Sequence, residues 1–233
     1  MSAVDAYDVL APHYKFYAEN RKEYLERIEK IVIARSNGAQ SLLDVGAGDG
    51  VRGLRIAKSA NIKTLVLMEP SAGMRAQCRE RADFWTCEAT GIPDVEARFE
   101  VITCLWNVFG HIRSGEERLL ALSRLKLLLS PSGSIFLDVN YRYNAASYGW
   151  TITLLRMMHD FFFRSERNGD VIVSWRIDGL NIRTRGHVFT QTELHRIFRA
   201  AGLKIKGKWV VNYSTGVEYK SPLRGNLLYQ LVL

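Results

Sequence analysis

The amino-acid sequence predicts an α/β domain built around a doubly wound parallel sheet. From residue 41 to residue 139, short apolar runs alternate with helical patterns, which is typical of strands joined by crossover helices. The first apolar run leads directly into a glycine-rich turn, GAGDG at residues 46–50. At 233 residues, of which 47% are hydrophobic, the chain can bury one sizeable core but is too short for two ordinary domains.

The expected elements follow in a regular order. Apolar residues recur at helical spacing from Tyr24 to Val32, in an N-terminal segment that Pro12 interrupts and that ends near Gly38. Strands are then expected over 41–45, 63–69, 83–89, 99–106 and 133–139, and helices over 51–60, 71–82 and 114–130. Ser71 and Ser114 are the expected N-caps of the last two helices.

Beyond Asn140 the pattern changes before the alternation resumes. An aromatic loop over 141–150 precedes a strongly apolar helix over 151–164. Two β-patterned runs within 170–189 flank Asp178-Gly179, a dipeptide that favours a hairpin turn. A helix over 190–202, stopped by Gly202, and strands over 203–213 and 226–233 then complete the sheet.

We therefore expect a single domain over 1–233, in four consecutive parts. These are an N-terminal helical cap (1–40), a core (41–140), an inserted helix and hairpin that form a lid (141–189), and a return to the sheet (190–233). The insertion is expected over the carboxyl ends of the strands, where open α/β sheets bind their ligands. The exposed edge of the hairpin, 171–188, is a candidate contact for a homodimer.

The net charge of +8 is confined to the C-terminal part of the chain. Residues 1–140 hold 18 basic and 18 acidic residues, whereas residues 141–233 hold 14 and 6. Such asymmetry is compatible with an anionic substrate, with a nucleic acid or with a solvated basic face.

The sequence argues against several classes of protein. The acids and tyrosines of the first 22 residues do not fit a signal peptide, and no run approaches the ~18 apolar residues of a membrane span. The three cysteines form neither a CxxC pair nor a dense disulfide pattern, and the five histidines lie in no cluster at ligand spacing. We expect a cytoplasmic protein with no membrane contact, reduced thiols and no metal.

The turn at 46–50 is expected to bring a ligand close to the backbone, because its three glycines lack a β-carbon. A G-x-G-x-x-G fingerprint would bind a pyrophosphate, but here Gly53 comes one residue too late. Asp44 and Asp49 would also repel a phosphate. The turn is better suited to a ligand with an ammonium or sulfonium group.

Carboxylates follow the next two strands. Glu69 lies 19 residues beyond Gly50, at the place where nucleotide folds put an acid that accepts hydrogen bonds from ribose hydroxyls. Glu88 is a candidate acceptor for the amine of an adenine. Candidate walls for the base are Trp85, Ile92 and Met74.

These segments resemble, in the same order, those of the class I S-adenosylmethionine (SAM)-dependent methyltransferases, particularly the branch that acts on small molecules. LLDVGAGDG resembles motif I, LMEP motif II, FEVITCLWNVFGHI the fourth-strand motif, and LLLSPSGSIFLDV the element that follows it. The match is close over roughly residues 40–140 and rests on topology elsewhere. It implies a Rossmann-like sheet of seven strands with the last antiparallel, SAM as cofactor and S-adenosylhomocysteine (SAH) as product.

The resemblance also implies which residues bind the cofactor. Asp44, Gly46, Gly48 and Asp49 would line the methionine moiety, Glu69 the ribose, and Glu88 and Ala89 the adenine. Further expected contacts are Ala47, Pro70, Met74, Leu105, Trp106 and Tyr14. The family usually has Asp where Glu88 stands, and Ser132 replaces the first glycine of its usual PGG.

Candidates for catalysis and for acceptor binding flank these segments. His111 is the candidate general base, Asn107 could orient an amine through its carbonyl, and Tyr14 is assigned by resemblance to the closing N-terminal helix. Expected acceptor contacts are Tyr7, Tyr17, Tyr141, Arg142 and Arg183. Each of these residues could instead simply pack.

Three functions follow from the sequence. The leading one is methyl transfer to a nitrogen or oxygen of a small metabolite, which the arginines of the insertion would suit if it is anionic. The second is an RNA methyltransferase, favoured by Lys204, Lys206, Lys208 and Trp209 but lacking the prolines typical of enzymes that grip a flipped base. The third is a noncatalytic SAM-binding module, which only turnover would distinguish.

Overall fold

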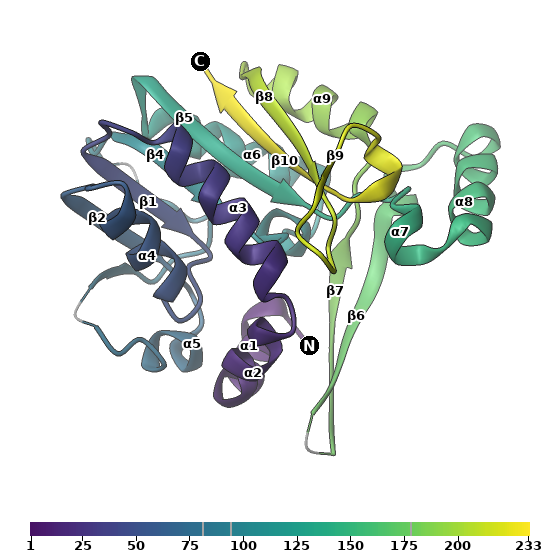
Figure 1. Ribbon diagram of the computed structural model, residues 1–233, viewed down its shortest axis with the longest axis horizontal. Coiled ribbons are helices and arrows are strands. Elements are labelled where there is room, and N and C mark those ends of the chain that lie inside the picture. Colours follow the sequence, from purple (N-terminus) through teal and green to yellow (C-terminus); the bar gives the residue numbers. More distant parts are fainter. Residues whose placement is uncertain (81, 94, 178) are drawn as a thin grey trace.

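One large sheet forms the centre of the molecule in the computed structural model, which describes residues 1–80, 82–93, 95–177 and 179–233 (Figure 1). Its strand order is β3-β2-β1-β4-β5-β10-β8-β9. The strands are β1 (Ser41–Val45), β2 (Thr64–Met68), β3 (Asp83–Trp85), β4 (Phe99–Cys104), β5 (Leu129–Val139), β8 (Lys204–Val211), β9 (Glu218–Tyr219) and β10 (Asn226–Val232). The strands from β3 to β5 pair in parallel, and β10 pairs antiparallel with both β5 and β8.

The expected doubly wound sheet and its antiparallel last strand are confirmed, but the expected number of strands, seven, is wrong. The described chain forms an eight-stranded sheet. The additional strand is the two-residue β9, which pairs with Val210 and Val211 at the end of β8. It falls between Gly216 and Pro222, in a stretch too short and too polar for alternation to reveal a strand.

Helices cover both faces of the sheet. They are α1 (Ala3–Leu10), α2 (Tyr14–Glu19), α3 (Lys22–Arg35), α4 (Val51–Ser59), α5 (Ala72–Ala76), α6 (Gly115–Leu127), α7 (Ala145–Tyr148), α8 (Trp150–Phe162) and α9 (Gln191–Ala200). Short 3-10 turns are η1 (Ala11–His13), η2 (Val108–His111), η3 (Glu166–Gly169) and η4 (Pro222–Arg224). Tyr24, Ile28 and Ile56 of α3 and α4 pack with Leu42 on one face. Leu122, Leu125 and Phe198 of α6 and α9 pack with Leu43 on the other, because successive strand residues point to opposite faces.

Three expected boundaries are wrong by four residues or more. The strand expected over 83–89 ends at Trp85 as β3. The helix expected over 71–82 is capped by Ser71 as predicted but ends at Ala76 as α5, since the charged residues that follow offer no apolar face to bury. The strand expected to begin at residue 133 begins at Leu129, where Leu129 pairs with Phe99 across an irregularity in the register. The N-cap Ser114 of α6 accepts the Glu117 N–H as expected.

The hairpin and the helix of the insertion lie in different parts of the molecule. Strands β6 (Asp170–Ile177) and β7 (Leu180–His187) form the expected hairpin, whose Trp175 and Ile182 pack against Ala6 and Leu10 of α1. Asp178 of the predicted turn lies outside the described residues, and Gly179 has a φ of 80°. Helix α8 lies at the margin of the molecule, away from α1 and α5 (Figure 1). Within the described residues, no helix is both long and apolar enough to span a membrane.

Candidate functional site

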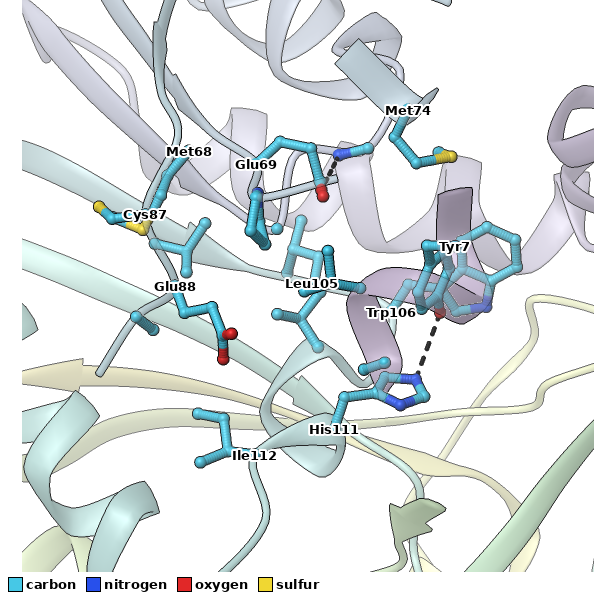
Figure 2. A pocket seen from close by; sticks show the side chains of 18 of the residues that line it. Tyr7, Met68, Glu69, Met74, Cys87, Glu88, Leu105, Trp106, His111 and Ile112 are labelled. Carbon is cyan, nitrogen blue, oxygen red and sulfur yellow. Dashed lines mark hydrogen bonds between the residues drawn. The ribbon is translucent and has the colours of Figure 1, made fainter. Parts of the chain in front are cut away.

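A pocket opens where the strand order reverses, at the carboxyl ends of β1, β2 and β4 (Figure 2). Its lining is mainly apolar with a few polar and charged groups, as in small-molecule sites. Expected residues that line it are Tyr7, Tyr14, Gly46, Gly48, Glu69, Pro70, Met74, Glu88, Ala89, Leu105, Trp106 and His111. The lining residues not expected are Ala3, Val4, Val45, Arg52, Met68, Cys87, Val108 and Ile112.

The glycine-rich turn forms one wall of the pocket without side chains. Gly46 and Gly48 adopt φ values of 66° and 62°, in the left-handed region that disfavours other residues. A β-carbon on Gly48 would lie 3.1 Å from Met74 Cε and 3.3 Å from the Tyr14 hydroxyl. The turn therefore needs glycine both for its conformation and for the space between the backbone and these two side chains.

Glu69 is held at the end of β2 by two backbone donors. Its Oε2 accepts the Gly48 N–H at 2.8 Å (Figure 2), and its Oε1 accepts the Ser71 N–H, also at 2.8 Å. Burial raises the pKa of this carboxyl, while the two hydrogen bonds oppose that shift. Each oxygen retains a further lone pair, so the carboxylate can still accept two hydroxyl groups of a ligand.

Glu88 lines the same pocket from the segment after β3, next to Cys87 and Ala89 (Figure 2). The expected walls Trp85 and Ile92 lie instead in the core: Ile92 is buried and Trp85 packs edge-on against Phe99. Trp85 and Ile92 lie close to Glu88 in the sequence, but their side chains pack into the core and do not face the pocket.

Arg52 was not foreseen from the sequence, although it lies in the first turn of α4, directly after the glycines. It is 8% exposed, lines the pocket, and its Nε has no hydrogen-bond partner within the described chain. Burial acts to lower the pKa of Arg52, but nearby charges, Asp44 first, hold it above the ordinary value. A buried guanidinium with a free donor is suited to an anionic group of a ligand.

Asp44 lies beneath the turn and is fully buried rather than lining the pocket. Its Oδ1 accepts the Thr103 hydroxyl at 2.7 Å, and its Oδ2 has no partner within the described residues. Burial raises the pKa of its carboxyl, and the charge of Arg52 opposes the rise. Asp44 therefore balances the charge of Arg52.

Strained backbone at the end of β4 shapes the opposite wall. Trp106 and Asn107 have φ values of 61° and 59°, which is uncommon outside glycine. The Trp106 N–H donates to Asp138 Oδ2 at 2.8 Å, and the Tyr24 hydroxyl donates to Oδ1 at 2.6 Å. Asp138 thus fixes the conformation that turns Trp106 toward the pocket.

The burial of Asp138 predicts a pH-dependent stability. Burial raises its pKa to about 6, above the value of about 3.9 in an unfolded chain, so its folded-state contribution is largest at low pH and is lost as pH rises through 6. Between about pH 8 and about pH 5, the unfolding free energy of the wild type should rise by about 1 kcal/mol more than that of Asp138→Asn. Urea unfolding of both proteins at the two pH values measures this difference, and identical pH dependences would contradict it.

Tyr7 and His111 meet in the lining of the pocket (Figure 2). The Tyr7 hydroxyl lies 3.2 Å from His111 Nε2, and His111 Nδ1 lies 3.3 Å from the carbonyl oxygen of Arg185 on β7. Because a carbonyl only accepts, Nδ1 carries the proton and Nε2 is left as an acceptor. Burial lowers the pKa of His111, so its ring is neutral at pH 7.

Helix α1 forms part of the pocket wall and is held to α5 by hydrogen bonds. Asp8 Oδ1 accepts the Ser71 hydroxyl at 2.6 Å and the Gly73 N–H at 2.8 Å, which ties α1 to α5. Ala3 and Val4 of α1 line the pocket beside Tyr7, and Tyr14 of α2 reaches the glycine turn. The residues that line the pocket all lie between Ala3 and Ile112.

Two other expected cofactor residues, Ala47 and Asp49, and the expected acceptor contact Tyr17 do not line the pocket. Ala47 is buried within the glycine turn. Asp49 accepts the Val51 N–H and lines a neighbouring cavity that also contains Arg52 and Arg55. Tyr17 stacks on Trp106, with ring centroids 5.4 Å apart.

Asn107 is occupied by the backbone rather than free to orient an amine. Its Oδ1 accepts the Asn140 N–H at 2.9 Å and its Nδ2 donates to the carbonyl oxygen of His187 at 3.4 Å. Asn107 therefore holds both ends of the insertion to the end of β4.

The expected acceptor residues of the insertion lie away from the pocket. Arg142 donates to both oxygens of Asp160, at 2.5 and 2.9 Å, and Tyr141 is buried against Tyr143. Arg183 lies on the exposed face of the hairpin. Arg185, on the same face, lines a groove whose other charged residues are Arg113, Arg118, Arg167, Glu116, Glu166 and Asp170. The groove therefore has mixed charge and is not a dedicated anion site.

Comparisons with known proteins agree with this geometry. The sequence profile of a family described as "Methyltransferase domain" matches residues 16–206. A dTDP-3-amino-3,6-dideoxy-alpha-D-glucopyranose N,N-dimethyltransferase of Streptomyces fradiae is 26% identical over 197 residues, covering 76% of this chain and 74% of the relative.

Solved structures share the fold. SAM-bound CalS10, an amino pentose methyltransferase of Micromonospora echinaspora, superposes with a TM-score of 0.64 and 16% identity over 94% of this chain and 96% of its own. A putative methyltransferase of Haloferax volcanii, solved with the activator Trm112, gives a TM-score of 0.69 and 16% identity over 99% of this chain and 97% of that one. With the matched profile covering most of the chain, the resemblance noted in the sequence is confirmed: this protein belongs to the methyltransferase-domain family of class I SAM-dependent methyltransferases.

Proposed function

We propose that this protein transfers a methyl group from SAM to an amine nitrogen of a small metabolite, with an amino sugar as the preferred class of acceptor. The observation that carries the proposal is the contact between the Tyr7 hydroxyl and His111 Nε2, 3.2 Å apart, in the lining of the cofactor pocket. The amino-sugar class is supported by the names of the relatives from S. fradiae and M. echinaspora.

The pocket fits SAM in each of its parts. Glycines at 46 and 48 leave room at the backbone, and Glu69 offers two lone pairs for ribose hydroxyls. We assign Arg52 to the carboxylate of the methionine moiety, because its buried Nε has no other partner in the described chain. Glu88 and Ala89 are assigned to the adenine. When bound, SAM supplies a methyl group on a sulfonium, ready for in-line displacement by a lone pair of the acceptor.

His111 and Tyr7 then act on the acceptor. The Arg185 carbonyl fixes the His111 tautomer with Nε2 as the acceptor, so the proton released by the methylated amine passes to the Tyr7 oxygen as the Tyr7 hydroxyl proton passes to Nε2. Tyr7, whose pKa is raised by burial, stays protonated and donates a hydrogen bond. An imidazole of lowered pKa is too weak a base to ionise an alcohol, which favours nitrogen over oxygen.

The RNA alternative is not favoured. Lys204, Lys206 and Lys208 lie on β8, which β4, β5 and β10 separate from β1 and its glycine turn. On its outer side β8 pairs only with the two-residue β9. The lysines of β8 can therefore serve to prevent edge-to-edge association of the sheet, without any role in binding RNA.

The test supplies methyl-labelled SAM together with a nucleotide-linked 3-amino-3,6-dideoxy sugar, its 3-hydroxy counterpart, or bulk RNA. Label is expected in the amino sugar only, and in none of the acceptors with Gly48→Arg, whose new side chain would fill the space beside Met74 and Tyr14. Label in the hydroxy sugar or in RNA would overturn the proposed acceptor. Calorimetric binding of SAH to the wild type separates a wrong acceptor from a wrong cofactor, since it requires no turnover.

A further inference from the structure

Helix α8 turns its polar side toward the rest of the chain and its apolar side toward solvent, the reverse of an ordinary surface helix. Its inward residues are polar or mixed: Thr153 is fully buried, and Arg156, Met157 and Asp160 are partly buried. These positions recur at helical spacing and form the side that faces the rest of the chain. A surface helix normally buries its apolar stripe and exposes its polar one.

The inward side is fastened by polar contacts. Asp160 accepts hydrogen bonds from the Arg142 guanidinium, from the Tyr143 hydroxyl at 2.7 Å and from Asn168 Nδ2 at 2.9 Å. Arg156 donates to the Arg142 carbonyl at 3.0 Å and lies 4.3 Å from the centre of the Tyr148 ring. These contacts set the rotation of α8, so the apolar side is turned outward by specific bonds.

The outward side is a mainly apolar surface, in which Thr151 and His159 are the exposed polar residues of α8. At about 100° per residue, its side chains fall within one arc of about 200°. They are Trp150, Ile152, Leu154, Leu155, Met158, Phe161 and Phe162, each 46–69% exposed, and Phe163 continues the surface at 67%. Contiguous exposed surface of this kind marks a site of association.

We propose that this face of α8 is the contact between two copies of the chain, packed helix against helix about a two-fold axis. Four aromatic side chains that can each bury about 150–250 Å² are more than half exposed here, and with the four aliphatic and methionine side chains they offer on the order of 800 Å². A stable interface buries about 800 Å² on each partner. A helix whose exposed side is mainly apolar is also self-complementary, as a two-fold contact requires.

The composition of the surface selects a protein partner over a membrane. All of residues 150–163 are described, and the exposed ones include no Lys, Arg, Asp or Glu, although an exposed arginine, Arg164, follows directly. The centres of protein interfaces are depleted in these residues and enriched in Trp, Phe and Met. A helix lying on a membrane carries Lys and Arg on its polar side, facing lipid headgroups. Here that side is turned inward, and its one cation is bonded to Arg142 and Tyr148.

The interface leaves the cofactor pocket free, because α8 lies away from α1 and α5 and the pocket is lined only from Ala3 to Ile112 (Figure 1). This inference does not depend on the proposed acceptor. It also differs from the hairpin contact expected from the sequence, which stays a prediction.

Sedimentation velocity of the full-length protein over about 0.1–100 μM tests the proposal. The wild type is expected to dimerise in this range, and Met158→Glu to raise the dissociation constant of the dimer at least about 100-fold. The matched control is Ile172→Glu, a charge placed on a side chain 64% exposed on the hairpin, which should leave the dimer intact. Loss of the dimer with Ile172→Glu alone would assign the contact to the hairpin and overturn the proposal.

A charge exchange distinguishes a lost contact from a misfolded helix. Met158→Glu and Met158→Lys should each be monomeric but form a mixed dimer when combined, because the two-fold axis brings α8 against α8. Failure of the mixture to associate would overturn the helix pairing. A monomeric wild type at every concentration, with or without binding to vesicles of phosphatidylcholine and phosphatidylglycerol, would overturn the dimer itself.

Discussion

Replacing Glu69 by Gln is expected to raise the dissociation constants for SAM and SAH about 100-fold. The amide keeps one acceptor but presents an NH2 group to one of the two backbone donors, Gly48 N–H or Ser71 N–H, that the carboxylate now satisfies. It also removes the charge that strengthens hydrogen bonds to ribose hydroxyls. Isothermal titration calorimetry with SAH measures the effect without turnover.

The pH dependence of binding provides a second readout. Because burial raises the pKa of Glu69, the wild type should lose affinity for SAH as pH falls toward that raised pKa, whereas Glu69→Gln should not. Glu96→Gln, which alters an exposed carboxylate away from the pocket lining, is the matched control and should bind as the wild type does. Unchanged affinity in Glu69→Gln would remove Glu69 from the cofactor site.

Replacing His111 by Gln is expected to lower kcat about 100-fold while leaving SAH affinity within about two-fold. The reason is that Nε2, the acceptor now facing the Tyr7 hydroxyl, is the proposed destination of the Tyr7 proton that the proton released by the amine replaces. Since burial lowers the pKa of His111, the wild type should lose activity only below the ordinary histidine value of about 6.5, and this acid limb should be absent from the variant.

His195→Gln is the matched control for His111. His195 also has a pKa lowered by burial, but it lies on α9, 3.4 Å from the Tyr229 hydroxyl, and does not line the pocket. Its replacement should leave kcat and the acid limb unchanged. If His111→Gln kept full activity and the same pH profile, the proton would pass directly to solvent and His111 would serve only to pack against Tyr7.

Much of the cofactor wall could be predicted because the patterns that build it are local. A glycine turn after a buried strand and acids after the next two strands meet at one sheet edge whatever the rest of the chain does. Gly46, Gly48, Glu69 and Glu88 line the pocket for this reason. Arg52 was missed because an arginine in a first helical turn ordinarily points to solvent, whereas here it is 8% exposed and lines the pocket.

The sequence by itself determined the doubly wound sheet, the glycine turn and the acid at the end of β2, since alternation and spacing act over a few residues. Only the tertiary structure decided that the described side chains of the insertion do not line the pocket. Arg142 is drawn to Asp160, 18 residues later, and that pairing rotates α8 so that its apolar side faces outward. Hydrophobic periodicity shows that a helix has an apolar face, but contacts between segments distant in sequence determine what that face meets.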